Sequence, residues 1–336
     1  MTDRVAELIE AADMNALLRV IDGLCSSQSW EGLIDLADRC EEALERGKQL
    51  WPIAAHVDYR LALEAPGDYA ADVLGSPLSR FALGPLTEVA ASTHTWAELS
   101  PYIEAPHIAA FVAQERVLRG EDLTGAPGIH LEVLELPPKL MGFEPHYSLA
   151  TYRSNVVEIA DPWDPRPLYP VQEALAQDLS EPDVEHALLE LVTPWTEESN
   201  GAARAVIVEG PASAAISKIA FGEMAAVTID GTEALKLMAW AAASGGAHGR
   251  RRGAALGRAL AWRTAAVLVD LPWPTEPARL ASQIDRLLWY RWTEAGPDEG
   301  WSLRLAVEDT EHGWAAAIGA ADLLQEEMAE EPPTPS

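Results

Sequence analysis

The hydrophobic periodicity of this 336-residue sequence changes near residue 120, and that change constrains the fold more than any other feature. Before it, apolar residues recur at three- and four-residue steps, which is the pattern of one helix face. The clearest helix lies in residues 30–47, where Leu33, Leu36 and Cys40 share a stripe and Gly47 is a suitable stop. Similar short segments follow, separated by Gly, Pro and Ser. This part of the chain predicts stacked helical hairpins, as in solenoids, or a plain irregular helical domain.

After residue 120 the pattern favours strands mixed with helices. Alternating apolar residues in 129–136 and 147–160 predict strands, and helices are expected at 182–192, at 211–220 and, as a long helix, after Asp230. Strands are expected at 203–210 and 224–231. The fold class is therefore mainly α with an α/β C-terminal part, divided into a helical domain (1–125), an α/β-containing domain (126–325) and a disordered acidic tail (326–336).

One segment, "SGGAHGRRRGAALGR" at 244–258, places four arginines and five glycines in a chain of net charge −29. The residues from 250 onward have a helical composition. Gly253, Gly257 and Ala261 are four apart, so they would share a face and let another helix approach closely. Arg258 is expected to stack on Trp262, four residues later.

Two interpretations of this Gly/Arg segment stay open. The favoured one is that its arginines pair with the acidic region 298–331, which holds ten acidic residues and one basic residue. The alternative is a binding site for a phosphate or carboxylate ligand, because backbone N–H groups, a helix N-terminus and arginines would converge there. The residues of that candidate ligand site are Gly245, Gly246, His248, Arg250, Arg251, Arg252 and Arg258.

Familiar catalytic signatures are absent from the sequence. It contains no GxxxxGK[ST], no GxGxxG after a strand, and no GxSxG, HExxH or CxxC, so whether the protein is an enzyme stays undecided and no metal or cofactor is expected. His94 and Glu98 lie one helical turn apart, which fits two metal ligands, but a surface pair or a helix cap is favoured.

Two aromatic or acidic stretches have competing interpretations. "DTEHGW", with Asp309, Glu311 and His312, is favoured as a solvated acidic turn over an acid–base site. Trp289 and Trp292 in "LLWYRW" suit a stacking surface for a sugar or base, but core packing is favoured because tryptophan buries a large apolar area.

Charge and cysteine content restrict the partners and the compartment. A net charge of −29 repels phosphate backbones, which argues against general nucleic-acid binding. The longest stretch without a charged residue has thirteen residues (237–249), too short for a membrane span of about 20. No secretory signal is visible, and Cys25 and Cys40 fit small core residues in a reducing compartment. These features predict a cytoplasmic protein.

The segments "RFALGPLTEVAASTHTWAEL", "ERVLRGEDL", "SLATYR" and "SGGAHGRRRGAALGR" resemble an uncharacterised protein family of high-GC Gram-positive bacteria. The resemblance covers most of the chain and implies no activity. The function favoured by the residues is a non-enzymatic protein–protein interaction or regulatory role. The alternatives are a ligand-binding module or enzyme centred on 244–258 and, from charge alone, a nucleic-acid mimic that occupies a basic groove.

Overall fold

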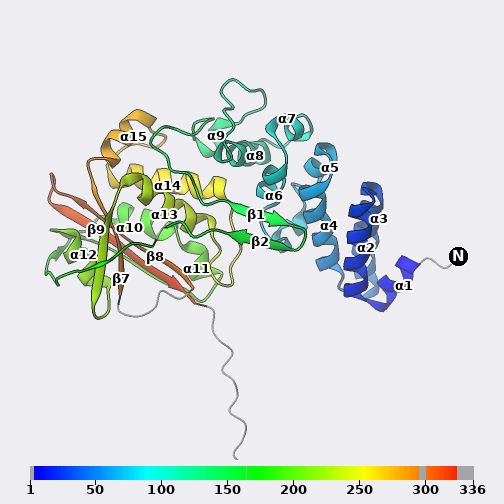
Figure 1. Cartoon of the computed structure of the whole chain (residues 1–336), viewed down its shortest axis with the longest axis horizontal. Helices are drawn as coiled ribbons and strands as arrows, with labels where there is room; N and C mark the ends of the chain where they lie inside the picture. Colours follow the sequence, from blue (N-terminus) through cyan, green and yellow to red (C-terminus); the bar gives the residue numbers. More distant parts are fainter. Residues whose placement is uncertain (1–3, 164, 295–299, 324–336) are drawn as a thin grey trace, which may run out of the picture.

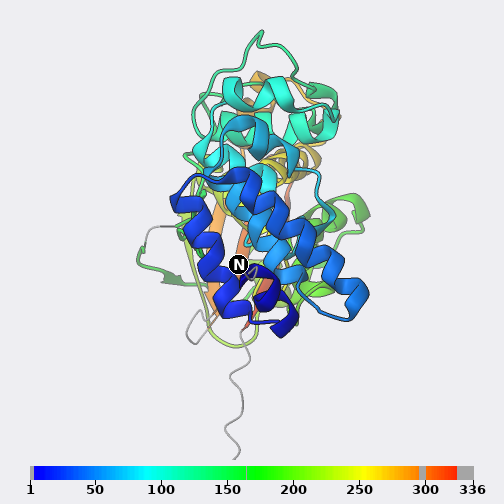
Figure 2. The same ribbon diagram turned by 90° about the vertical axis from the view of Figure 1, so that its right-hand side faces the viewer.

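The protein is elongated, with helices at its N-terminal end and a β-sheet covered by helices at the other end (Figures 1 and 2). This arrangement comes from a computed structural model that describes residues 4–163, 165–294 and 300–323. The predicted tail at 326–336 lies outside the described residues. Within the described part of the chain, no helix is long and apolar enough to cross a bilayer.

The helical part confirms the predicted periodicity. Its first helices enclose a core with Leu17, Leu33 and Leu61, and the later ones enclose a second core with Leu86, Val89 and Val112. Its elements are α1 (Arg4–Ala11), α2 (Met14–Ser26), α3 (Trp30–Glu42), η1 (Ala43–Arg46), α4 (Trp51–Glu64), α5 (Gly67–Asp72), η2 (Pro77–Phe81), α6 (Leu86–Thr93), α7 (Trp96–Leu99), η3 (Ser100–Tyr102), α8 (Pro106–Leu118) and α9 (Leu131–Leu134).

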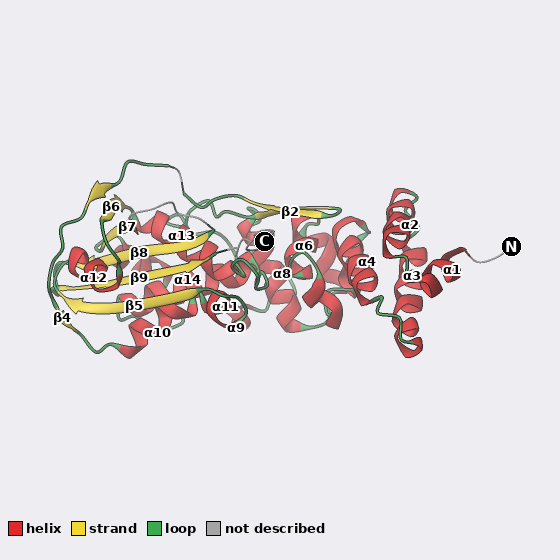
Figure 3. Cartoon of the chain, turned by 90° about the horizontal axis from the view of Figure 1, so that it is seen from below, coloured by secondary structure: helices red, strands yellow, loops and turns green. Residues whose placement is uncertain are grey.

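The C-terminal half contains a seven-stranded sheet in which every neighbouring pair is antiparallel. The strand order is β3-β6-β7-β8-β9-β5-β4, so the two-residue strands β3 and β4 form the edges. Figure 3 shows the long central strands side by side. The strands are β3 (Tyr169–Pro170), β4 (Gln177–Asp178), β5 (Ala202–Glu209), β6 (Met224–Ile229), β7 (Leu288–Glu294), β8 (Trp301–Asp309) and β9 (Trp314–Asp322).

Both faces of this sheet are covered by helices. Alternate residues of β9 point to opposite faces, so Ala315 and Ala317 pack in the core under α12, while Ala316 and Ile318 pack in the core beneath α13 and α14. This arrangement confirms the mixed α/β fold predicted for the C-terminal half. The helices are α10 (Pro182–Glu190), α11 (Thr193–Glu197), α12 (Ala212–Ile219), α13 (Gly231–Ala243), α14 (Ala254–Leu268) and α15 (Pro277–Ile284).

The strand predicted at 129–136 was wrong. Residues 131–134 form the short helix α9, and Glu135 adopts a left-handed backbone (φ 55°). Alternation alone does not make a strand, because the segment has no neighbouring strand to pair with and Pro137 follows it. The strand predicted at 147–160 is confirmed in part: the segment forms two strands, β1 (Ala150–Arg153) and β2 (Val156–Ile159), which pair as an antiparallel hairpin around a turn at residues 154–155.

Gly257 sets the close packing of α13 against α14, as its place in the sequence predicts. A Cβ atom at Gly257 would overlap the carbonyl oxygen of Ala239 and crowd the Cβ of Ala243 at 2.9 Å. Replacing Gly257 by Leu should therefore destabilise the protein by about 3 kcal/mol, at the upper end of overpacking costs, because backbone atoms must move. Urea unfolding measures this loss. Gly23→Ala is the control, since nothing lies within 4 Å of the Cβ position there, and it should not destabilise.

Candidate functional site

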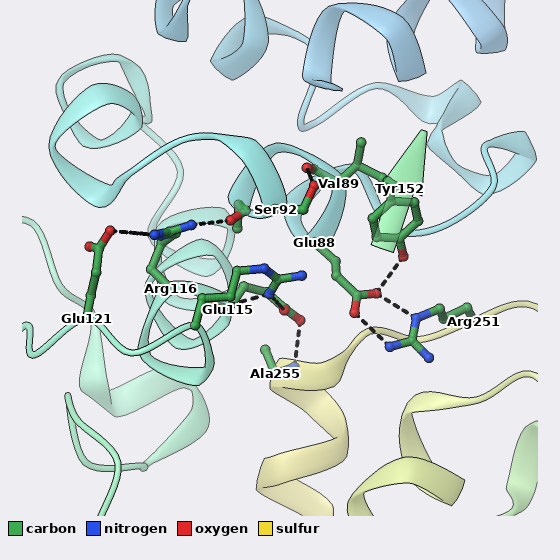
Figure 4. A network of polar contacts seen from close by, with 11 residues as sticks. Glu88, Val89, Ser92, Glu115, Arg116, Glu121, Tyr152, Arg251 and Ala255 are labelled. Atoms are coloured by element: carbon green, nitrogen blue, oxygen red, sulfur yellow. Dashed lines mark hydrogen bonds and ion pairs between the residues drawn. The ribbon is translucent and has the colours of Figure 1, made fainter. Parts of the chain in front are cut away.

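The Gly/Arg segment connects α13 to α14 and lies where the helical part meets the sheet part. Ser244 follows the last residue of α13, and α14 begins at Ala254, so Arg250, Arg251 and Arg252 precede the helix. Figure 4 shows that the start of α14 faces α6 and α8. The segment therefore presents its cationic groups to the helical part of the chain.

Arg251 forms a buried bidentate ion pair with Glu88 of α6. Its Nη2 donates to Glu88 Oε1 at 2.7 Å and its Nε donates to Oε2 at 2.8 Å, while the side chains are 6% and 1% exposed (Figure 4). The Tyr152 hydroxyl of β1 donates to the same carboxylate at 2.8 Å. The prediction that Arg251 pairs with the acidic region 298–331 was wrong, because Glu88 in the helical part is its partner.

Glu115 of α8 caps the N-terminus of α14. The residue at the N-cap position is Gly253, which has no side chain to accept from the free N–H groups of the first turn. Glu115 fills this role from another helix: its Oε1 accepts a hydrogen bond from the N–H of Ala255 at 2.6 Å (Figure 4). Its Oε2 accepts a hydrogen bond from Nη1 of Arg119 at 2.7 Å. A side chain of the protein itself thus satisfies one of the free N–H groups at this helix terminus.

The two buried carboxyl groups of this cluster have opposite pKa shifts. Burial alone would raise the pKa of Glu88, but the charge and hydrogen bonds of Arg251 hold it below its usual value. Burial and the negative charge of Glu88 raise the pKa of Glu115 from 4.5 to about 7. Glu115 is therefore mostly protonated only below about pH 7, whereas Glu88 beside Arg251 stays ionised.

The raised pKa of Glu115 predicts a pH-dependent stability. Between about pH 4.5 and 7 the folded protein binds a proton at Glu115 that the unfolded chain has released, so stability should fall as the pH rises through this range. Glu115→Gln removes the titrating group and should make the decline from pH 5 to pH 8 shallower. Urea unfolding at several pH values tests this, with the exposed Glu104→Gln as control. A decline of equal steepness in Glu115→Gln would contradict the assignment.

Arg258 forms the second buried ion pair of the segment, with Glu144 in the connection after α9. Its Nε and Nη2 each donate to this carboxylate at 2.7 Å, and both side chains are 0% exposed. Further donor bonds reach the carbonyl oxygens of Pro137 and Lys139. The predicted stacking is confirmed, since the guanidinium lies 5.6 Å from the Trp262 ring centroid.

The glycines of the segment permit close backbone approach. A Cβ at Gly245 would overlap backbone atoms of Gly249 and Arg250, and one at Gly246, which has φ +72°, would overlap a carboxylate oxygen of Asp322. The same carboxylate accepts the N–H of Ala247 at 2.6 Å. These glycines let the loop fold onto itself and onto the end of β9.

The other predicted ligand residues point to separate partners. His248 is exposed, and its backbone N–H donates to Ser199. Arg250 is exposed with its guanidinium 5.5 Å from the Phe81 ring centroid. Nη1 of Arg252 is buried and has no hydrogen-bond partner among the described residues. The structure therefore joins Arg251 and Arg258 to glutamates of their own, and the ligand site itself stays a prediction.

The other motifs have structural roles. Glu98 forms a capping box with Thr95, which confirms the helix-cap interpretation, and the His94 ring contacts the backbone oxygens of Ala65 and Ala90. No group of three His, Cys, Asp or Glu side chains able to hold a metal occurs among the described residues.

The prediction of core packing for the aromatic stretch is confirmed, and the prediction of a solvated acidic turn is correct only in part. Trp289 and Trp292 are 1% exposed, which confirms core packing. Asp309, expected in a solvated turn, is 2% exposed; its carboxylate accepts Arg286 Nη1 at 2.7 Å and approaches His312 Nδ1 at 2.8 Å. The buried carboxylate of Asp309 therefore holds the turn through its contacts with Arg286 and His312, while the side chains of Glu311 and His312 are exposed.

Sequence reasoning missed the acidic partners Glu88, Glu115 and Glu144. A signal existed for the first two: each is an acidic residue within an otherwise apolar stretch, "LTEVAAS" and "IAAFVAQE". An acidic residue in a buried helical stripe requires a cation or a proton, so such positions were candidates for pairing with the arginines.

A comparison with protein families identifies the family to which the chain belongs. The profile of one family, described as "Family of unknown function (DUF6183)", matches residues 15–323, which is most of the sequence. The chain belongs to the DUF6183 family. This membership agrees with the resemblance to an uncharacterised family seen in the sequence. No curated protein and no solved structure matches the chain.

In this DUF6183 protein, Arg251 and Arg258 of the Gly/Arg segment form buried ion pairs with glutamates of the same chain. Two buried ion pairs and one helix cap connect the segment 251–258 to Glu88, Glu115 and Glu144. Charged groups buried in this way hold two packed surfaces in one register, because misplacing either surface would leave a charge uncompensated. The contacts with Glu88 and Glu115 therefore join the sheet part to the helical part. The Arg258–Glu144 pair holds the connection after α9 against α14.

Proposed function

We propose that this protein is a non-enzymatic interaction protein that binds a basic partner through an acidic stripe on its N-terminal helices. The stripe runs along α3 into η1 and consists of Glu31, Asp35, Asp38, Glu42 and Glu45. Their spacing of four, three, four and three residues places them on one helix face, and each is exposed. This stripe is the observation that carries the proposal.

The charges of the stripe are largely uncompensated. Asp35 pairs with Arg39 at 3.4 Å, and Glu31 accepts the Tyr69 hydroxyl. Asp38, Glu42 and Glu45 have no ion pair with any other described residue. A row of free carboxylates on a rigid helix attracts Lys and Arg side chains and directs the encounter electrostatically. A basic helix or basic loop of a protein partner suits this surface.

Affinity purification from the native host tests the proposal. The wild-type chain should retain a stoichiometric protein partner at low salt and release it at high salt, and the triple variant Asp38→Asn, Glu42→Gln, Glu45→Gln should lose it. A matched triple variant at other exposed acids, Asp161→Asn, Glu173→Gln, Glu197→Gln, should retain it. Equal retention by both variants would contradict the role of the stripe.

A second candidate function is the binding of a small anion at the Gly/Arg segment, and the buried, unpartnered Nη1 of Arg252 favours it. Sulfate or phosphate would then raise the melting temperature beyond the effect of chloride at equal ionic strength. Arg252→Ala should abolish that difference. An equal response to all three salts would remove this candidate.

We also infer a cytoplasmic location. Cys25 and Cys40 are free thiols rather than a disulfide, which is usual for proteins of a reducing compartment. Fractionation of the native host with an antibody against the protein tests this location.

A further inference from the structure

A cavity of about 720 Å³ lies in the sheet part, between α10, the C-terminal end of α14 and the turn that joins β8 to β9. Its apolar lining includes Val184, Val267 and Leu271, and the half-buried indole of Trp314 adds an aromatic surface. This space opens to solvent along its acidic rim, where Glu181, Asp183 and Asp270 are exposed, and it is large enough for a small molecule.

The charge around the cavity is negative. Its lining contains five carboxylates and two guanidinium groups, and both guanidinium groups already have acidic partners. Arg263 lies 3.6 Å from Glu190, and Arg286 lies 2.7 Å from Asp309. The remaining carboxylates, which have no ion pair with any other described residue, are those of Glu181, Asp183 and Asp270.

Three further features favour a positive ligand. The 15-residue helix α14 ends at Leu268 on the cavity wall, so the negative end of its dipole faces the same space as the free carboxylates. His312 lines the cavity with Nδ1 2.8 Å from an oxygen of Asp309, so in the tautomer that donates from Nδ1 the Nε2 atom can accept a hydrogen bond. The indole of Trp314 can stabilise a cation by contact with its face.

We propose that this cavity binds a small organic cation, an ammonium or guanidinium group carried on an apolar body. The charged head lies near Asp183 and Asp270, and the apolar body lies against Val267 and Leu271. An organic anion is disfavoured because the cavity offers it no unpaired arginine. The cavity is separate from the acidic stripe on α3, so failure of either proposal leaves the other intact.

Three probes of matched length test the proposal by thermal shift and titration calorimetry: hexylammonium, hexanol and hexanoate, at equal ionic strength. Hexylammonium should bind and stabilise the protein, while hexanol should bind more weakly and hexanoate should not bind. The variant Asp183→Asn, Asp270→Asn should weaken hexylammonium binding about tenfold. Asparagine tolerates the left-handed backbone at Asp270 (φ 52°), so this variant should fold normally.

The control is Asp68→Asn, Glu104→Gln, which removes the same charge at exposed residues of the helical part, outside the acidic stripe, and should bind hexylammonium like the wild type. Absence of hexylammonium binding, equal binding of hexanoate, or equal weakening in both variants would overturn the proposal. The last result would identify nonspecific attraction to an acidic protein.

Discussion

Replacing Glu144 by alanine should destabilise the protein by about 3–5 kcal/mol. The variant leaves the guanidinium of Arg258, which is 0% exposed, without its carboxylate partner. The hydrogen bonds from the indole N–H of Trp262 and the hydroxyl of Tyr147 to the same carboxylate are also lost. Because a domain is typically stable by only about 5–15 kcal/mol, a loss of this size would be visible as a strongly lowered urea midpoint.

The exposed Glu132→Ala serves as the control for Glu144→Ala. Glu132 interacts with His130 at the surface, and its side chain is 71% exposed, so its loss should change the midpoint little. A similar, small effect of both substitutions would mean that Arg258 is not held by a buried ion pair.

Replacing Arg251 by methionine should cost about 3–5 kcal/mol, because Glu88 would remain buried without a cation. Arg251 is also what lowers the pKa of Glu88, so in the variant burial should raise that pKa above its unfolded value. Stability should therefore fall more steeply with rising pH in Arg251→Met than in the wild type. Urea unfolding at pH 5 and pH 8 measures both effects.

Arg250→Met is the matched control for Arg251→Met. Arg250 is the preceding residue, is exposed and makes no ion pair within the described part of the chain. Its replacement should leave the stability and its pH dependence nearly unchanged. Equal losses in both variants would show that the segment needs positive charge in general rather than the specific pair with Glu88.

Local structure was largely predictable because its signals lie close together in the sequence. The helix expected after Asp230 begins there, with a capping box between Asp230 and Glu233. The close approach at Gly257 and the stacking of Arg258 on Trp262 depend on residues within or next to one helix, and both were predicted.

Long-range pairing was not predictable from the same signals. Arg251 and Glu88 are 163 residues apart. The apolar stretch around Glu88 marks it as a buried acid that needs a partner, but nothing in the sequence says which arginine that partner is. Strand β9 has the sequence "WAAAIGAAD", whose alanines favour helix in isolation. The strand forms because helices cover both of its faces, which selects small side chains, and the sequence does not reveal that burial.

A double-mutant cycle between Arg251 and Glu88 tests the central claim most directly: the Gly/Arg segment binds glutamates of the helical part and joins the two halves of the molecule. The unfolding free energies of the wild type, Arg251→Met, Glu88→Gln and the double variant give the coupling between the two side chains. The buried bidentate pair predicts a coupling of at least about 2 kcal/mol, with the double variant more stable than the two single losses would suggest. A coupling below about 0.5 kcal/mol would contradict the account.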